Sequence, residues 1–171
     1  MFEETYARWT HKFNEKETDS TTLFSGSSFV ELRNALPSRV AIVSAFVDKA
    51  MRFISIFRDE HDNNLEIELA LREALVNAIV HGNKENPAKR VRVRCRCTEA
   101  GEVAIAIEDE GQGFEYDAIA DCTLPEHLLR EHGRGIYLIR TLMDDVHFEQ
   151  GGSVICMSKR AHASDSMRKP Q

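Results

Sequence analysis

The segment from Leu65 to Asn83 constrains the fold most, because its apolar residues recur with the period of an α-helix. These residues predict a helix with one face packed on a core, and they are Ile67, Leu71, Ala74, Leu75, Ala78 and Ile79. Glu73 and Asn77 stand four residues apart, so the helix projects both side chains from one face. A proton-accepting carboxylate beside a neutral amide oxygen suits the chemistry of Mg²⁺ and phosphate, although the pair alone also fits an ordinary solvated face.

The composition is that of a globular protein and argues against one class of ligand. The 171 residues are consistent with one domain, and 42% of them are hydrophobic against 29% charged. The net charge of -6 argues against direct binding of nucleic acid, which requires a basic excess. One basic cluster alternates along an expected strand and predicts a solvated or partner-facing surface; it comprises Arg90, Arg92, Arg94 and Arg96. Its apolar counterface is Val91, Val93, Cys95 and Cys97.

The cysteine spacing argues against a zinc motif, and the hydropathy pattern argues against a secreted or membrane-spanning protein. The spacing of Cys95, Cys97, Cys122 and Cys156 is not that of a zinc site. Cys95 and Cys97 point the same way on one strand, so we expect them to pack as small apolar side chains. We find no cleavable signal peptide and no apolar run long enough to cross a membrane, and therefore expect a cytoplasmic protein without a membrane partner.

We expect three parts along the chain: an N-terminal extension over residues 1–28, one domain over residues 29–160 and a flexible tail over residues 161–171. In the extension, four aromatic residues at helical spacing predict a helix over Met1–Glu17; they are Phe2, Tyr6, Trp9 and Phe13. Such a stripe favours docking on its own domain or a second subunit, with a dedicated partner-binding arm as the alternative. Thr18–Ser28 is typical of a linker.

Within the domain, strands and helices alternate with turn signals. We expect a first strand over Phe29–Arg33 and a helix that Pro37 opens and that runs to Phe57. After the Leu65–Asn83 helix, the pattern predicts a hairpin, a long loop, a further helix and a second hairpin. The strands of the first hairpin are expected at Arg90–Glu99 and Glu102–Glu108, and the loop at Glu115–His132. The helix is expected at Ile136–Met143, and the strands of the second hairpin at Val146–Glu149 and Ser153–Ser158.

Two glycine motifs follow the Glu73 and Asn77 pair. The second hairpin strand leads into Asp109, and Gly111 and Gly113 come directly after it, where glycine permits close approach to a ligand. Gly133, Arg134 and Gly135 precede the apolar helix, so its free N–H groups and positive dipole end would suit phosphate. Each motif alone is also typical of turn or packing chemistry.

In this order, the three motifs resemble the nucleotide-binding family of gyrase-type ATPases, Hsp90 and histidine kinases. Within that family, the runs Glu73–Gly82 and Gly133–Ile139 are similar to motifs of the bacterial anti-sigma factor serine kinases. The similarity spans about Phe29–Lys159. It implies the Bergerat ATP-binding fold, a two-layer α+β sandwich with helices on one face of a mixed, mostly antiparallel sheet.

The resemblance also implies a role for each motif residue. Glu73 would be the catalytic base and Asn77 the ligand of Mg²⁺, while Asp109 would accept a hydrogen bond from the adenine amino group of ATP. Gly111 and Gly113 would let a lid formed by the long loop approach the nucleotide, and Ser153 would support the adenine site. Phosphate would lie against Gly133, Arg134 and Gly135. The implied protein partners are a sigma factor, an anti-anti-sigma protein of the STAS type and a second copy of the chain.

The sequence departs from that family's pattern in two places. Ser153 stands where relatives have Thr, and Glu131 and His132 stand where kinases of the family place an arginine and a serine; Arg130 or Arg134 are candidates to replace that arginine. The Glu73 and Asn77 pair and both glycine motifs make an anti-sigma factor kinase the leading hypothesis. Glu131 and His132 motivate the alternative, a nucleotide-gated binding protein without kinase activity. A self-contained ATP hydrolase is disfavoured, because we find no transducer domain.

Overall fold

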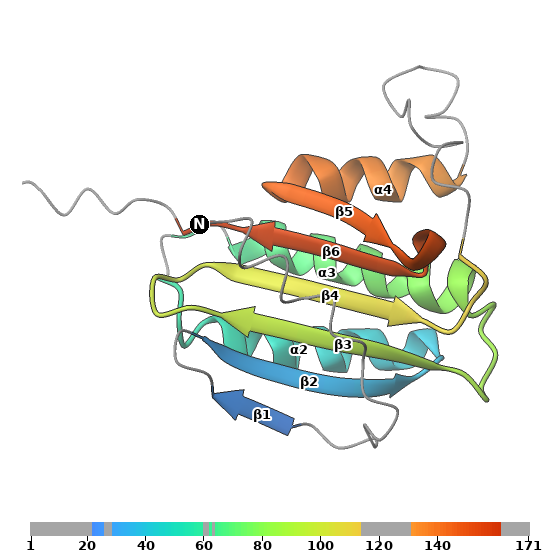
Figure 1. Ribbon diagram of the computed structural model, residues 1–171, viewed down its shortest axis with the longest axis horizontal. Coiled ribbons are helices and arrows are strands. Elements are labelled where there is room, and N and C mark those ends of the chain that lie inside the picture. The colour runs from blue at the N-terminus through green and yellow to red at the C-terminus, as the bar shows by residue number, and fades with distance from the viewer. Residues whose placement is uncertain (1–21, 26–28, 60–61, 63, 114–130, 162–171) are drawn as a thin grey trace, which may run out of the picture.

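A single antiparallel sheet forms one layer of the molecule (Figure 1). The structure, a computed structural model, describes residues 22–25, 29–59, 62, 64–113 and 131–161. Within these residues, six strands are ordered β1-β2-β3-β4-β6-β5 and every neighbouring pair is antiparallel. Their bounds are β1 (Thr22–Ser25), β2 (Val30–Pro37), β3 (Arg90–Cys97), β4 (Val103–Asp109), β5 (Asp145–Glu149) and β6 (Val154–Lys159).

The helices form the second layer, on one face of the sheet (Figure 1). In the described part of the chain the α-helices are α2 (Val43–Ile54), α3 (Asn64–Val76) and α4 (Glu131–Leu142), and α3 contacts both of the others. Three short helical segments connect the elements: η1 (Val40–Ile42), η2 (Asn77–Gly82) and η4 (Gln150–Gly152). The α+β two-layer architecture expected from the sequence is therefore confirmed.

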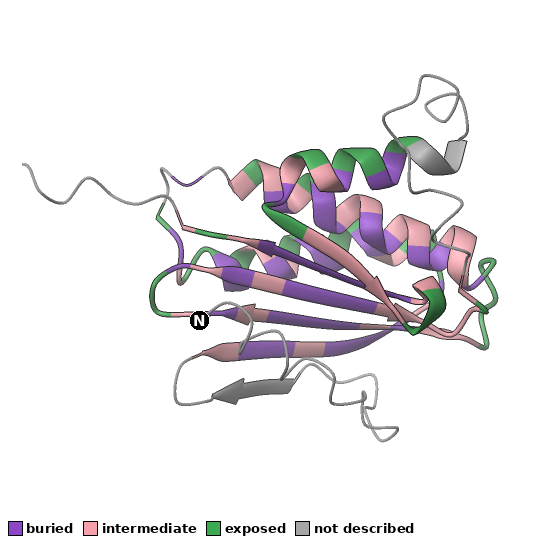
Figure 2. Ribbon diagram, turned by 45° about the horizontal axis from the view of Figure 1, so that its top comes forward, coloured by how far each residue is buried: buried purple, intermediate pink, exposed green. Residues whose placement is uncertain are grey.

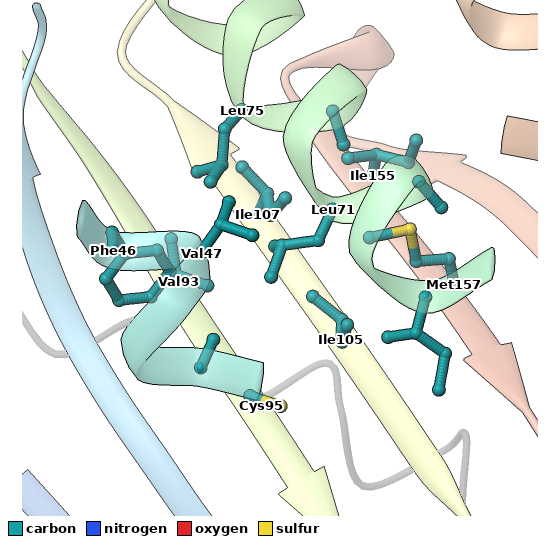
Figure 3. Close-up of a cluster of buried hydrophobic side chains, with 14 of the residues drawn as sticks. Phe46, Val47, Leu71, Leu75, Val93, Cys95, Ile105, Ile107, Ile155 and Met157 are labelled. Atoms are coloured by element: carbon teal, nitrogen blue, oxygen red, sulfur yellow. The ribbon is translucent and has the colours of Figure 1, made fainter. Parts of the chain in front are cut away.

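The hydrophobic core lies between the two layers (Figure 3). Leu71 and Leu75 of α3 are fully buried against Ile105 and Ile107 of β4, which occupies the middle of the sheet. Burying one such side chain stabilises the fold by roughly 1.5–3 kcal/mol. The apolar stripe of the Leu65–Asn83 segment accordingly faces the sheet, and Figure 2 shows this buried side of the helices.

Two expectations for the N-terminal part of the chain are wrong. Pro37 does not open a helix but ends β2, where it pairs with Arg90 of β3. The pairing of β2 with β3 prevails over the helix-start signal, and a proline without an N–H is tolerated at a strand end. The segment expected as a linker contains a strand, because Thr22–Ser25 pairs with β2 as β1.

The face of the sheet opposite the helices carries the arginines of β3, and it is less solvated than expected. Arg94 is only 4% exposed, and Arg96 pairs with the fully buried Glu31 of β2. Arg33 pairs with the same carboxylate, and the Arg96 guanidinium lies 4.5 Å from the centre of the Phe29 ring. The expected solvated surface is therefore corrected to a partly buried ion-pair network, since a buried carboxylate requires such partners.

Some sequence expectations concern residues outside the described part of the chain, and others agree with the structure. The aromatic helix over Met1–Glu17, Cys122 and almost all of the loop Glu115–His132 lie outside them. Among the helices that the structure describes, none is long and apolar enough to cross a membrane. Cys95 and Cys97 are buried, as the packing interpretation predicts.

Candidate active site

Glu73 and Asn77 stand at a change of helix geometry. Asn77 begins η2, a π-helical segment that continues directly from α3. The Asn83 N–H donates to the Ala78 carbonyl at 2.8 Å, five residues back, as a π-helix requires. Both Glu73 and Asn77 are half-buried. The segment expected as one regular helix therefore widens at the residue that sequence analysis selected.

Gly135 of α4 lies directly against this pair. A Cβ atom at position 135 would be 2.0 Å from Glu73 Oε1 and 3.1 Å from Asn77 Nδ2. Only a glycine permits α4 to approach α3 this closely at that point. The structure thus brings together Glu73, Asn77 and Gly135, which lie on two different helices.

A pocket opens beside these residues between the helical layer and the ends of β4 and β6. Four residues selected from the sequence line it: Asn77, Asp109, Gly113 and Ser153. The remaining lining is Ala74, Ala78, His81, Gly82, Lys84, Ile107, Ile136, Phe148, Gly152 and Ile155. An apolar cavity with a few polar groups at defined positions is typical of a small-molecule site.

Asp109 is held in place by glycines on two sides. Its Oδ1 accepts a hydrogen bond of 2.7 Å from the Gly111 N–H, and its N–H donates to the Ser153 carbonyl at 3.0 Å. A Cβ at Gly82 would be 2.3 Å from the Asp109 carboxyl carbon, so the carboxylate rests on the end of η2. Burial raises the pKa of Asp109, although the Gly111 N–H and Lys89 act in the opposite direction.

Gly113 also lines the pocket. Its φ is +71°, and a Cβ there would lie 2.0 Å from the Gly151 carbonyl oxygen. Positive φ and backbone contact both require glycine at this position. The loop after β4 and the turn between β5 and β6 are therefore in contact at this position.

Asn83 is a site residue that sequence reasoning missed. Its side chain is 1% exposed, its Nδ2 donates to the Arg90 carbonyl at 2.8 Å, and its Oδ1 accepts from the Glu110 N–H at 2.8 Å. The Glu110 carboxylate in turn accepts from the Arg90 N–H and from Arg92 Nη2, each at 2.9 Å. These bonds fasten η2, β3 and β4 around Asp109. An Asn directly after a helix-ending glycine is the signal in the sequence that could have identified it.

The third motif is placed differently from the sequence expectation. Gly133, Arg134 and Gly135 lie inside α4, which begins at Glu131, rather than ahead of the helix. Arg134 is exposed, and of the three only Gly135 is shown in contact with Glu73. The N–H groups of the first helical turn still lack intrahelical partners, and they include those of Gly133 and Arg134. Glu131 and His132 also belong to this turn.

Comparison with known proteins identifies the family. The model of the histidine kinase-like ATPase domain matches residues 34–159, most of the chain, and the protein belongs to this family. The serine-protein kinase RsbW of Staphylococcus epidermidis is 29% identical over 142 residues, which cover 79% of this chain and 88% of that protein.

Two other relatives match a shorter region at higher identity. The serine-protein kinase RsbW of Oceanobacillus iheyensis is 35% identical over 101 residues, which cover 55% of this chain and 63% of the relative. The anti-sigma F factor of Heyndrickxia coagulans is 33% identical over 99 residues, which cover 54% of this chain and 66% of the relative. The resemblance to anti-sigma factor serine kinases is therefore confirmed.

Proposed function

We propose that this protein is an ATP-dependent serine kinase that binds a sigma factor and phosphorylates an anti-anti-sigma protein. The observation that carries the proposal is the packing of Glu73 and Asn77 against Gly135, beside a pocket that Asp109 lines. The residues proposed as general base and metal ligand thus lie together beside the cavity proposed to hold the nucleotide. The names of the relatives, serine-protein kinase and anti-sigma factor, support the same activity.

Asp109 is proposed to select the base of the nucleotide. Its carboxylate accepts a hydrogen bond from the adenine amino group, a donor that guanine lacks at that position. Ile107, Ile155 and Phe148 give the pocket an apolar surface suited to a flat ring. The Ser153 hydroxyl donates to the Gln150 carbonyl at 3.1 Å, which orders the turn beside this end of the pocket.

Glu73 and Asn77 are proposed to act on the phosphates. The Asn77 amide oxygen is a hard neutral donor of the kind that Mg²⁺ accepts, and it would hold this ion, which neutralises phosphate charge when bound. The partner's serine oxygen forms a bond to the γ-phosphorus, and the bond from that phosphorus to the β,γ-bridging oxygen breaks. Glu73 takes the serine proton, and ADP carries away the bridging oxygen.

Replacing Asp109 with Asn is expected to weaken ATP binding about 10–100-fold, since a hydrogen bond to a charged acceptor contributes roughly 1.5–3 kcal/mol. Because burial raises the pKa of Asp109, the folded state binds this proton more tightly than the unfolded state. The ionised carboxylate therefore costs stability at neutral pH, and the variant should unfold at a higher temperature. In the wild type, ATP affinity should fall as the pH drops through that raised pKa.

Glu108→Gln is the matched control for this prediction. Burial also raises the pKa of Glu108, whose Oε2 is buried without a hydrogen-bond partner among the described residues. This variant should gain thermal stability but keep full ATP affinity, because Glu108 lies outside the pocket lining. Calorimetric titration and thermal unfolding measure both quantities. Equal losses of affinity in the two variants would contradict the role of Asp109.

The proposal extends to the setting in which the kinase works. A protein that sequesters a sigma factor acts in the cytoplasm and needs no direct contact with nucleic acid or membrane. A second copy of the chain completes the proposed assembly as a homodimer. The mass of the protein in solution tests this part independently of the activity.

A second candidate is a nucleotide-gated binding protein that holds partners without modifying them. Glu131 and His132 favour it, because they occupy positions where kinases of the family carry an arginine and a serine. Capture of partners from native lysate separates the two functions, with one sample in Mg-ATP and one in a non-hydrolysable analogue. Phosphoserine on a small partner only with ATP supports the kinase, and unmodified partners in both samples support the binding protein.

A further inference from the structure

We propose that the protein carries a zinc site formed by His147, Glu149 and Cys156 on the face of the sheet opposite the nucleotide pocket. His147 and Glu149 lie on β5, and Cys156 lies on β6. One ligand atom from each residue lies within 4.8 Å of the other two. The site is separate from the residues assigned to ATP and uses none of them.

The register of the hairpin creates this cluster. His147 and Glu149 are two residues apart on one strand, so both side chains leave the same face of the sheet. His147 is directly opposite Cys156 across the β5–β6 pair. Cys156 packs with Ala106 and Val154 in a small outer cluster, whereas Phe148 packs against the main core on the other face. The three ligand residues therefore lie together on the outer face.

The distance between the two ligand atoms of β5 fits a tetrahedral metal site. His147 Nε2 and Glu149 Oε1 are 3.2 Å apart, whereas two ligands bound to zinc at about 2.0–2.1 Å lie about 3.3 Å from each other. Cys156 Sγ lies within 4.8 Å of both atoms, whereas a thiolate bound at about 2.3 Å would lie about 3.5 Å from them, so the three side chains must close by up to about 1.3 Å to bind a metal. Three protein ligands leave the fourth tetrahedral position open.

The donor set selects the class of metal. A thiolate with an imidazole favours zinc and similar borderline-soft ions, whereas Mg²⁺ and Ca²⁺ prefer oxygen ligands alone. His147 and Glu149 have side chains 32% and 29% exposed, which gives a cation access, while Cys156 is 3% exposed. A cation that binds here must displace the proton of the Cys156 thiol.

The surrounding charges partly oppose one another. Asp145 lies two residues before His147 on β5, and its negative charge acts on the same cysteine as that of Glu149. Arg94 of β3 acts on that cysteine with the opposite sign. Burial has a larger effect than any of these charges and raises the pKa of the Cys156 thiol to about 12, so a metal competes there with a firmly held proton.

Zinc at this position would cross-link an edge strand to its neighbour. In the described sheet, β5 pairs only with β6 and ends the strand order. The same strand carries Phe148, which lines the nucleotide pocket from the other face. We therefore expect zinc to stabilise β5, and with it the wall of the pocket formed by Phe148.

The test uses the full chain without an affinity tag, stripped of metal by a chelator. Titration with zinc against a chromophoric chelator should show one tight equivalent, and cobalt should give a thiolate-to-metal charge-transfer band in the near ultraviolet. Zinc should also raise the unfolding temperature of the wild type. Cys156→Ser and His147→Gln should each weaken zinc binding more than about tenfold, since even the loss of an outer-shell partner costs that much.

Asp145→Asn is the control, because it removes a carboxylate from the same strand and face without removing a ligand. It should keep both the zinc stoichiometry and the cobalt band. The absence of zinc uptake by the wild type would overturn the proposal. Uptake that Cys156→Ser and His147→Gln leave unchanged would place the metal elsewhere and would overturn it equally. If Cys156→Ser fails to fold, His147→Gln decides the matter, because the His147 side chain is 32% exposed and its loss leaves the core intact.

Discussion

Glu73→Gln should lower the rate of serine phosphorylation about 10²–10⁴-fold, the usual contribution of a general base. Gln preserves the size of the side chain beside Gly135 but cannot accept the serine proton. ATP affinity should remain nearly unchanged, because the pocket lining does not include Glu73. Single-turnover transfer of labelled phosphate and calorimetric titration with ATP measure the two effects separately.

Glu68→Gln provides the control for this substitution. Glu68 lies on the same helix and forms an ion pair of 3.2 Å with Arg72, away from Gly135 and the pocket. Loss of that half-exposed pair should leave phosphate transfer unaffected. If the Glu73 variant transfers phosphate as fast as the wild type, Glu73 is not the base.

Gly113→Ala should abolish measurable ATP binding and lower the unfolding temperature. The added Cβ would lie 2.0 Å from the Gly151 carbonyl oxygen, and the residue would keep a φ of +71° that L side chains rarely adopt. Since the clash is with backbone, the loop after β4 and the turn before β6 must move apart. That movement opens the pocket wall formed by Gly113, Gly152 and Ser153.

Gly151→Ala distinguishes the effect of backbone strain at positive φ from the effect of a steric clash. Gly151 has a similar φ of +65°, but a Cβ there would meet no atom of the described residues within 4 Å. This variant should therefore lose stability by roughly 1–2 kcal/mol, the cost of left-handed backbone for an L residue, and still bind ATP. Equal affinity of the two variants for ATP would show that the contact between Gly113 and Gly151 does not shape the pocket.

The sequence predicted the elements whose pattern is strong and local. The apolar period of the Leu65–Asn83 segment predicted α3 and its buried face, and the alternation after Arg90 predicted the β3–β4 hairpin. The start of η2 at Asn77 could not be predicted, because helix propensity does not encode a π-helical turn. The helix start predicted at Pro37 was wrong, because the place of Pro37 at the end of β2 depends on a strand more than fifty residues away.

The sequence predicted which residues are candidates for the site but not how they are arranged in space. Asp109 and Gly113 were selected from one motif, yet the contacts of Asp109 with Gly82 and of Gly113 with Gly151 arise only in three dimensions. The same limit explains Cys156, which pairs with His147 only through strand register. Sequence spacing alone therefore excluded a zinc motif but could not reveal a cross-strand set of ligands.

The balance between ADP and phosphoserine in a single turnover tests the central claim most directly. The purified protein, saturated with Mg-ATP, is mixed with an excess of its anti-anti-sigma partner, and both products are counted after quenching. The account predicts one phosphoserine for each ADP formed. ADP without phosphoserine would indicate a hydrolase, and a bound partner with neither product would indicate a binding protein; either result would contradict the kinase.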